Sequence, residues 1–191
     1  MSYLPLQPSS TVILFADLQQ GIVELQSTNE PKRLRAAVAA LAKLARLFHL
    51  PAIVTTAPGG DGKAIVIPEI GAALGELPQH LRTTTDSFTD AATRDAIVAV
   101  KRPTLLIAGV ATEIIVQHSA LSGVSHGLNV QVVVDACGGL SPRTEDAALR
   151  RLTQAGVVTT SVASVAGQLA GDFTQASGAQ ALGVLYEMVA G

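Results

Sequence analysis

The chain has 191 residues, of which 48% are hydrophobic and only 15% are charged, and its formal net charge is −2. This composition excludes a disordered protein, which would combine few apolar residues with a high net charge. The near-neutral charge and the 3% aromatic content also argue against a nucleic-acid partner, because such binding needs a basic surface and often stacking platforms. The length fits one domain over residues 1–191.

The cysteine content and the targeting signals narrow the class further. Cys137 is the single cysteine, which excludes a disulfide framework and a cysteine-rich zinc site. The first residues lack the charged and apolar regions of a signal peptide, and no apolar run reaches the ~18 residues of a membrane span. We therefore expect a cytoplasmic protein with no membrane partner. The low charged fraction predicts a homo-oligomer, because association would hide apolar surface.

Short apolar runs rich in β-branched residues are the strongest local pattern, and they predict strands. In chain order they are 11–16, 52–56, 104–108, 130–134 and 157–160. The first run ends in Asp17, and the fourth ends at Asp135. Their continuous rather than alternating apolar character is typical of strands buried on both faces, as in a parallel sheet.

The stretches between these runs carry helical signals, such as apolar residues at helical spacing, a cap residue and Pro31 at a start, and Gly156 at an end. The predicted helices are 31–48, 90–100 with Asp90 as N-cap, 112–126, 142–155 after Ser141, and about 178–189. The Gly/Pro-rich stretch 57–68 is expected to be a loop. Strands alternating with helices predict a doubly wound, mostly parallel α/β sheet, whose ligands bind beyond the carboxyl ends of the strands.

Three features are expected at that edge of the sheet, and they are the candidates for a functional site. Asp17 is either a turn or cap residue, or a general acid or base whose pKa is raised by burial. The segment 109–112 is either an ordinary strand–helix turn or a cluster of backbone N–H groups able to stabilise an oxyanion. Arg82, considered alone, is expected to be a surface arginine.

The other titratable residues give no sign of a metal or cofactor site. His49, His80, His118 and His126 lack metal-ligand spacing relative to one another and to carboxylates. The glycines of a phosphate-binding loop are absent after the first strand. Cys137 is expected to be a small buried residue rather than a nucleophile. We therefore expect neither a metal nor a cofactor.

The chain resembles the isochorismatase-like hydrolases, also called cysteine hydrolases. The resemblance is carried by VILFADLQ (12–19), LIAGVATEIIV (106–116), VVVDACGG (132–139) and RTEDAA (143–148), and it covers about residues 8–175. The segment GVATE, followed by a Ser-Ala-Leu helix, is most similar to the YcaC-like branch. The resemblance implies a three-layer α/β sandwich with a parallel sheet of about six strands and a symmetric oligomer.

The resemblance also implies a site. Active members use an aspartate, a lysine and a cysteine, which fall on Asp17, Arg82 and Ile115 in this sequence. The nucleophile position is therefore occupied by a side chain that cannot attack a carbonyl or nitrile carbon. Ala111 and Thr112 take the oxyanion position, with a cis peptide expected between Val110 and Ala111. Gln19 is implied to bind substrate.

Three functional hypotheses follow from the presence of Ile115 at the position of the family's cysteine. The first is a hydrolase acting on a small carboxylate, amide or vinyl-ether substrate by a thiol-independent route, with Asp17 as general acid or base and Arg82 as an anchor for anions. The second is a non-catalytic pseudoenzyme that retains the fold as an oligomeric binding or scaffold module. In the third, another residue contributes, such as His118, one helical turn after Ile115. A site closed by packing of Ile115 against Asp17 would favour the second hypothesis.

Overall fold

The computed structural model describes residues 4–59 and 64–190. Its strands are β1 (Thr11–Ala16), β2 (Ala52–Thr56), β3 (Gln79–Leu81), β4 (Thr104–Val110), β5 (Asn129–Gly138) and β6 (Val158–Thr160). They form one six-stranded sheet in the order β3-β2-β1-β4-β5-β6, and every pairing is parallel. The predicted doubly wound parallel sheet is confirmed.

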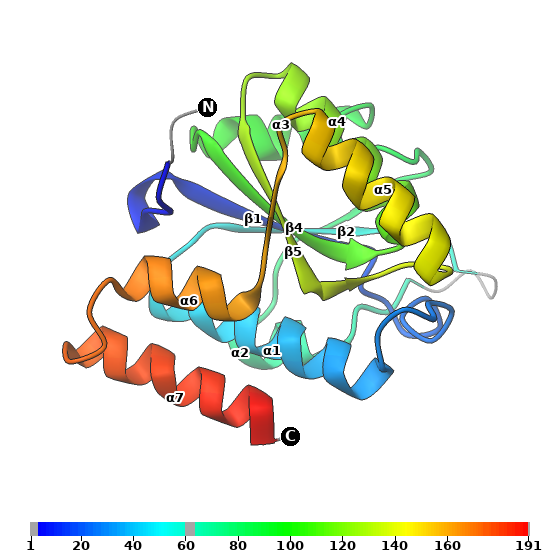
Figure 1. Ribbon diagram of the computed structural model, residues 1–191. Helices are drawn as coiled ribbons and strands as arrows, with labels where there is room; N and C mark the ends of the chain where they lie inside the picture. The colour runs from blue at the N-terminus through cyan, green and yellow to red at the C-terminus, as the bar shows by residue number, and fades with distance from the viewer. Residues whose placement is uncertain (1–3, 60–63, 191) are drawn as a thin grey trace.

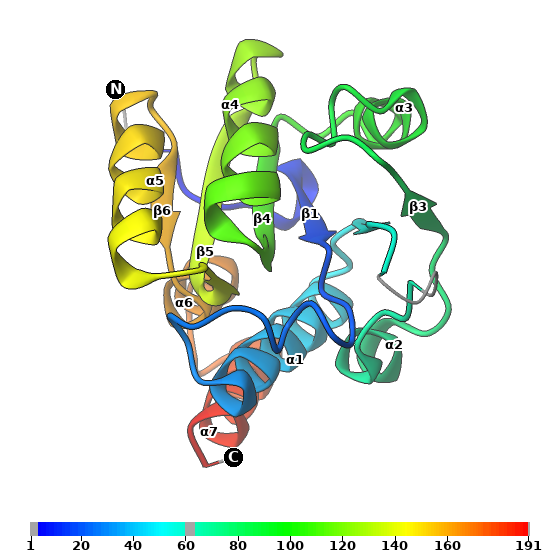
Figure 2. The same ribbon diagram turned by 90° about the vertical axis from the view of Figure 1, so that its right-hand side faces the viewer.

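Helices cover both faces of the sheet, so the fold has the predicted three layers. They are α1 (Pro31–Leu47), α2 (Pro68–Leu74), α3 (Ala91–Ala99), α4 (Gln117–Ser125), α5 (Pro142–Gln154), α6 (Val162–Ala170) and α7 (Ala176–Ala190), with the short turns η1 (Pro8–Ser10) and η2 (Thr112–Val116). Helices α1, α2 and α6 lie on one face, with α7 packed outside α1 and α6, and α3, α4 and α5 lie on the other (Figures 1 and 2). No helix among the described residues combines the length and apolar character needed to cross a membrane.

The hydrophobic core is divided by the sheet into two clusters. Strand β1 is buried along its whole length, which explains its continuous apolar sequence. Its Ile13 and Phe15 belong to the cluster beneath α1 and α6, whereas Val12 and Leu14 belong to the cluster beneath α3, α4 and α5. Because successive residues of a strand point to opposite faces, β1 serves both layers and lies at the centre of the molecule.

Most of the predicted start and stop signals act as expected. The Asp90 carboxylate accepts the Thr93 N–H at 2.8 Å to cap α3, and the Ser141 hydroxyl caps α5. Gly156 follows α5 with a φ of 89°, in the left-handed region that favours glycine. Glu30 is the N-cap of α1, directly before Pro31, and the side-chain amide of the preceding Asn29 donates to backbone carbonyls on β5.

The local differences from the sequence prediction concern short or irregular elements. Strand β5 continues past Asp135, with an irregular register against β4 between Ile107 and Gly109. Helices α2 and α6 and the three-residue edge strand β3 were not predicted, and Pro68 begins α2 rather than ending a loop. Residues 60–63 of the predicted loop lie outside the described residues. The predicted helix at 112 begins as the π-helical turn η2 before α4.

Candidate active site

Asp17 lies at the carboxyl end of the central strand. It follows β1 with a φ of 54°, in the left-handed region that Asp tolerates better than most residues. Its backbone N–H donates to the Thr55 carbonyl at 3.1 Å, and the Thr55 hydroxyl donates to Asp17 Oδ1 at 3.2 Å. Only 5% of Asp17 is exposed. The backbone therefore directs a buried carboxyl group to the edge at which α/β sheets bind ligands.

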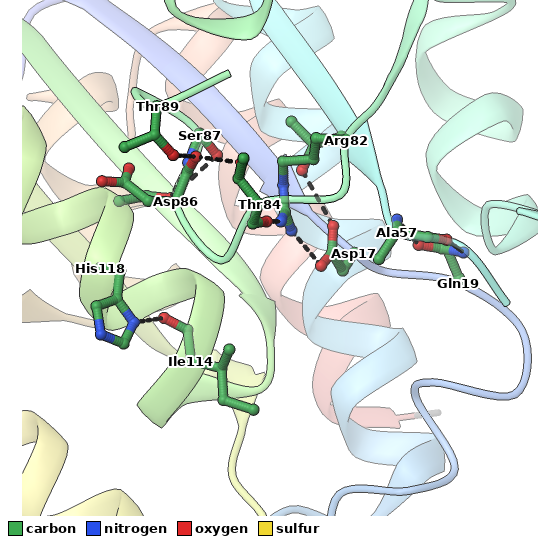
Figure 3. Close-up of polar contacts among 12 residues, drawn as sticks. Asp17, Gln19, Ala57, Arg82, Thr84, Asp86, Ser87, Thr89, Ile114 and His118 are labelled. Carbon is green, nitrogen blue, oxygen red and sulfur yellow. Dashed lines mark hydrogen bonds and ion pairs between the residues drawn. The ribbon is translucent and has the colours of Figure 1, made fainter.

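Arg82 is brought to the same place from the edge of the sheet. It follows β3, and its backbone N–H donates to the Thr56 carbonyl at 3.0 Å. The guanidinium Nη2 forms an ion pair with Asp17 Oδ2, and Nη1 donates to the Thr84 carbonyl (Figure 3). Arg82 is only 3% exposed, so the expectation of a surface arginine is wrong. The Asp17 carboxylate compensates for removing this permanent cation from water.

Two opposing effects act on the ionisation of Asp17. Burial raises the pKa of its carboxyl above the ordinary value, because water no longer stabilises the charged form. The positive charge of Arg82 and the hydrogen bonds from Arg82 and Thr55 oppose this rise. Burial has the larger effect. A carboxyl with a raised pKa keeps its proton at a higher pH than a surface aspartate does, which is the property that a general acid needs.

The end of β4 lies directly beside Asp17. Gly109 pairs with Ala16, so Val110 occupies the next position of the register. A Cβ on Gly109 would lie 2.4 Å from the Ala16 carbonyl oxygen, so this close approach requires glycine. The strand order reverses between β1 and β4, which is where doubly wound sheets form their ligand crevice. The peptide between Val110 and Ala111 is cis, as predicted.

The segment after β4 is the predicted oxyanion position. Ala111 is 8% exposed and Thr112 is fully buried. The Ala111 carbonyl accepts the N–H groups of Ile114 at 3.1 Å and Val116 at 3.4 Å, so these two amides are used within η2. The Thr112 hydroxyl donates to Glu145 Oε1 at 2.7 Å. The two residues stand at the predicted edge, and their role toward an oxyanion stays a prediction.

Ile115 occupies the position that the resemblance assigns to the nucleophile. It is 1% exposed and belongs to the core cluster beneath α3, α4 and α5. Its cluster includes Ala16, the residue before Asp17, and Cys137. The position is therefore occupied by an apolar side chain packed into the core, and it offers no group that could form a covalent bond to a substrate.

Gln19 and His118 make local contacts. Gln19 is 1% exposed, and its side chain bonds the backbone of Ala57 twice, with Nε2 donating at 3.0 Å and Oε1 accepting at 2.7 Å. Gln19 thus holds the loop after β2 in place, and its role toward a substrate stays a prediction. His118 Nδ1 lies 2.7 Å from the Ile114 carbonyl, on the side of the helix away from Asp17 (Figure 3).

The single thiol is buried in the core cluster beneath α3, α4 and α5. Cys137 is 1% exposed, and burial raises its pKa to about 12. It is therefore a neutral thiol at physiological pH, as the sequence predicted. Within residues 4–59 and 64–190, no group of three or more His, Cys, Asp or Glu side chains is arranged to hold a metal ion.

Sequence reasoning did not identify two partners of the Asp17–Arg82 pair. Thr55 bonds Asp17 through its hydroxyl, and Thr84 bonds Arg82 through its backbone carbonyl. Threonine is common in strands and loops, so neither residue carries a sequence signal of its own. Thr55 could have been found from its place near the end of a predicted strand, since such positions meet at the ligand edge of a parallel sheet.

Comparison with known sequences shows where this arrangement belongs. The chain matches the Isochorismatase domain over residues 11–164. It is 35% identical over 157 residues to the probable hydrolase YcaC of Escherichia coli (strain K12), which is 81% of this chain and 74% of that protein. It is 29% identical over 168 residues to isochorismatase domain-containing protein 2 of Bos taurus, which is 87% of this chain and 78% of that protein.

Solved structures agree with the sequence comparison. YcaC from Pseudomonas aeruginosa, determined with hexane-2,5-diol and covalent acrylamide, matches with a TM-score of 0.89 at 31% identity over 96% of this chain and 93% of that one. The Escherichia coli YcaC gene product, described as an octameric hydrolase of unknown specificity, matches with a TM-score of 0.91 at 30% identity over 99% of this chain and 93% of that one. The motifs, the sheet order and these matches agree, and the chain belongs to the isochorismatase family.

Proposed function

We propose that this protein is a hydrolase of a small carboxylate, amide or vinyl-ether substrate that works without a thiol nucleophile. The observation that carries the proposal is the buried Asp17–Arg82 pair at the point where the strand order reverses. A buried ion pair is weak evidence of stabilisation, because desolvation of both charges offsets their attraction. Its position at the ligand edge, together with the raised pKa of Asp17, favours a catalytic purpose.

In this mechanism Asp17 is the general acid and base. With a vinyl ether, Asp17 protonates the alkene carbon, water adds to the resulting cation, and the hemiketal collapses to a ketone and an alcohol. The Asp17 carboxylate takes its proton back from the water that has added, and collapse of the hemiketal only moves the hydroxyl proton to the departing alcohol oxygen, so Asp17 ends as it began. Arg82 remains charged throughout, because a guanidinium does not lose its proton in proteins. Its role is to orient Asp17 and to attract an anionic group of the substrate.

The test is a hydrolysis screen against small amides, carboxylate esters and vinyl ethers, followed by Asp17→Asn. The amide cannot deliver a proton, so the rate should fall about 10²–10⁴-fold. Asp135→Asn is the matched control, since Asp135 is also an aspartate that follows an apolar run and whose pKa is raised by burial. It should keep nearly full activity. Equal losses in the two variants, with both proteins folded, would contradict the assignment of Asp17.

The burial of Ile115 favours the alternative, a non-catalytic module that keeps the family fold. The Pseudomonas aeruginosa relative holds a covalent acrylamide, so acrylamide is a suitable reagent for a thiol introduced at position 115. We expect Ile115→Cys to form an acrylamide adduct, detected by mass spectrometry, at least about tenfold faster than Cys137 does, if Arg82 lowers the pKa of the new thiol. A thiol at 115 as inert as Cys137 would favour the pseudoenzyme.

We also propose that the chain forms a homo-oligomer. The Escherichia coli relative is described as octameric. In this chain α7 leaves Tyr186 68% and Val189 80% exposed, which is apolar surface that association would cover. Analytical ultracentrifugation at micromolar concentration should show a species several times heavier than the 19.6 kDa monomer. A single monomeric species would refute this proposal.

A further inference from the structure

The segment that follows Arg82 is fixed to helix α4 by one aspartate. Asp86 is 9% exposed, and both of its carboxylate oxygens are used. Oδ2 accepts the Ser122 hydroxyl of α4 at 2.5 Å, and Oδ1 accepts the Phe88 N–H at 2.9 Å. The side chain thus joins two parts of the chain that are 36 residues apart.

The backbone of the same residue holds the partner of Arg82. The Asp86 carbonyl accepts the Thr84 hydroxyl at 2.8 Å, and the Thr84 carbonyl accepts Nη1 of Arg82 (Figure 3). A continuous series of hydrogen bonds therefore runs from Ser122 through Asp86 and Thr84 to the guanidinium. Loss of the Asp86 side chain would release the turn that holds one of the guanidinium's two terminal nitrogens.

Helix α4 is also the helix that continues from the nucleophile position. Ser119 and Ser122 lie one and two helical turns after Ile115, which is part of η2. Ser87 provides a second tie to this helix, since its N–H donates to Ser119 Oγ at 3.0 Å and the two hydroxyl groups are 3.0 Å apart. Ser87 and Ser119 are fully buried. The Asp86 segment therefore sets Arg82 relative to position 115.

We propose that Asp86 is a positioning residue, which acts through Thr84 and Ser122 to hold Arg82 in register with Asp17 and with the start of helix α4. The inference rests on the proposed function only in taking the Asp17–Arg82 pair as the working site. Both oxygens of Asp86 face donors, which is why an aspartate suits the position. Asparagine is the conservative replacement, because its oxygen can still accept the Phe88 N–H while its amide donates to Ser122 Oγ.

The experiment measures solvent exchange of the Arg82 guanidinium N–H protons by NMR in the full-length ¹⁵N-arginine-labelled protein. Arg82→Lys identifies the signal. Asp86→Ala should accelerate exchange about tenfold, as expected when one supporting hydrogen bond is lost, and Asp86→Asn should restore most of the protection. The matched control is Asp90→Ala, which removes a side chain that bonds the Thr93 N–H and hydroxyl in the next turn of the same connection. It should change Arg82 exchange far less than Asp86→Ala does, because the Asp90 carboxylate affects Arg82 through its charge and not through a hydrogen bond.

Two outcomes would overturn the proposal: unchanged Arg82 exchange in Asp86→Ala, or equal acceleration in Asp90→Ala. If Asp86→Ala does not fold, Ser122→Ala removes only the α4 contact and should still accelerate exchange, and an unchanged signal there overturns the proposal too. With a hydrolysed substrate, Asp86→Ala should lower kcat more than it raises KM. The exchange measurement needs no substrate, so a failure to detect hydrolysis would count against the proposed function and leave the positioning role to be judged on exchange.

Discussion

Asp17 and Asp135 each follow an apolar run of β-branched residues, yet the fold uses them differently. The pKa of each is raised, mainly by burial. The Asp17 carboxylate faces the cation Arg82, whereas the Asp135 carboxylate accepts the backbone N–H of Val162 at 2.9 Å, where α6 begins. The comparison shows that the partner decides the role of an aspartate that follows an apolar run. A helix start needs only an acceptor for its N–H groups, whereas a buried guanidinium is stabilised by an adjacent carboxylate.

The largest expected difference between the two aspartates is in stability. Asp17→Ala leaves a permanent cation buried without its partner and should lower the free energy of unfolding by about 3–5 kcal/mol. Asp135→Ala removes one acceptor at a helix start and should lower it by about 0.5–2 kcal/mol. Urea unfolding followed by circular dichroism measures both. Similar losses in the two variants would show that the two carboxylates have equivalent roles.

Replacing Arg82 should lower the free energy of unfolding less than replacing Asp17 does. Arg82→Met leaves Asp17 buried, but the carboxyl can take up a proton, so the free energy of unfolding should fall by about 1–3 kcal/mol at pH 5. Arg82 lowers the pKa of Asp17, so in Arg82→Met the native pKa should rise further above the unfolded value, and the native state binds the extra proton. Stability is then lost as pH rises through the raised pKa. Urea unfolding of this variant at pH 5 and pH 8 should show the greater loss at pH 8, and a pH-independent loss would contradict the burial effect.

Cys137, two residues after Asp135, shows the effect of burial on a group whose charged neighbours, Glu145 and Asp135, also raise its pKa. Its pKa is raised from 9.0 to about 12, so above pH 9 the unfolded thiol ionises while the native thiol does not. The protein should therefore lose about 1.4 kcal/mol of stability per pH unit in that range. Cys137→Ala should remove this contribution to the slope of the free energy of unfolding against pH, measured by urea unfolding at pH 9, 10 and 11. An unaltered slope would mean that the thiol is accessible to water.

The sheet was predictable from local signals, and the exceptions were the elements in which those signals are weak. Strand β1 is an unbroken apolar run, and its role as a central strand follows from that pattern. Strand β3 has only three residues, Gln79–Leu81, two of them polar, and its extended form is imposed by pairing with β2. Helix α6 carried an overlooked signal, since Ser161 caps it by accepting the Ser164 N–H.

The candidate site was predictable only in part. Family motifs identified Asp17 and Arg82 as members of one site, although they are 65 residues apart and Arg82 alone indicates a surface residue. Nothing in the sequence pattern indicated that Asp86 and Ser122 would tie the Arg82 segment to α4. Contacts of this kind depend on how the connection between β3 and α3 packs against α4, and no local periodicity records them.

The sequence by itself determined the parallel sheet, the helix ends at Asp90, Ser141 and Gly156, and the absence of a thiol at position 115. These properties depend on residues close together in the chain, where hydrophobic periodicity, capping and side-chain chemistry act locally. The tertiary structure decided which charges meet and what surrounds Ile115. Such contacts arise only when distant segments converge at the reversal of the strand order, where burial raises the pKa of Asp17 and makes its pairing with Arg82 necessary.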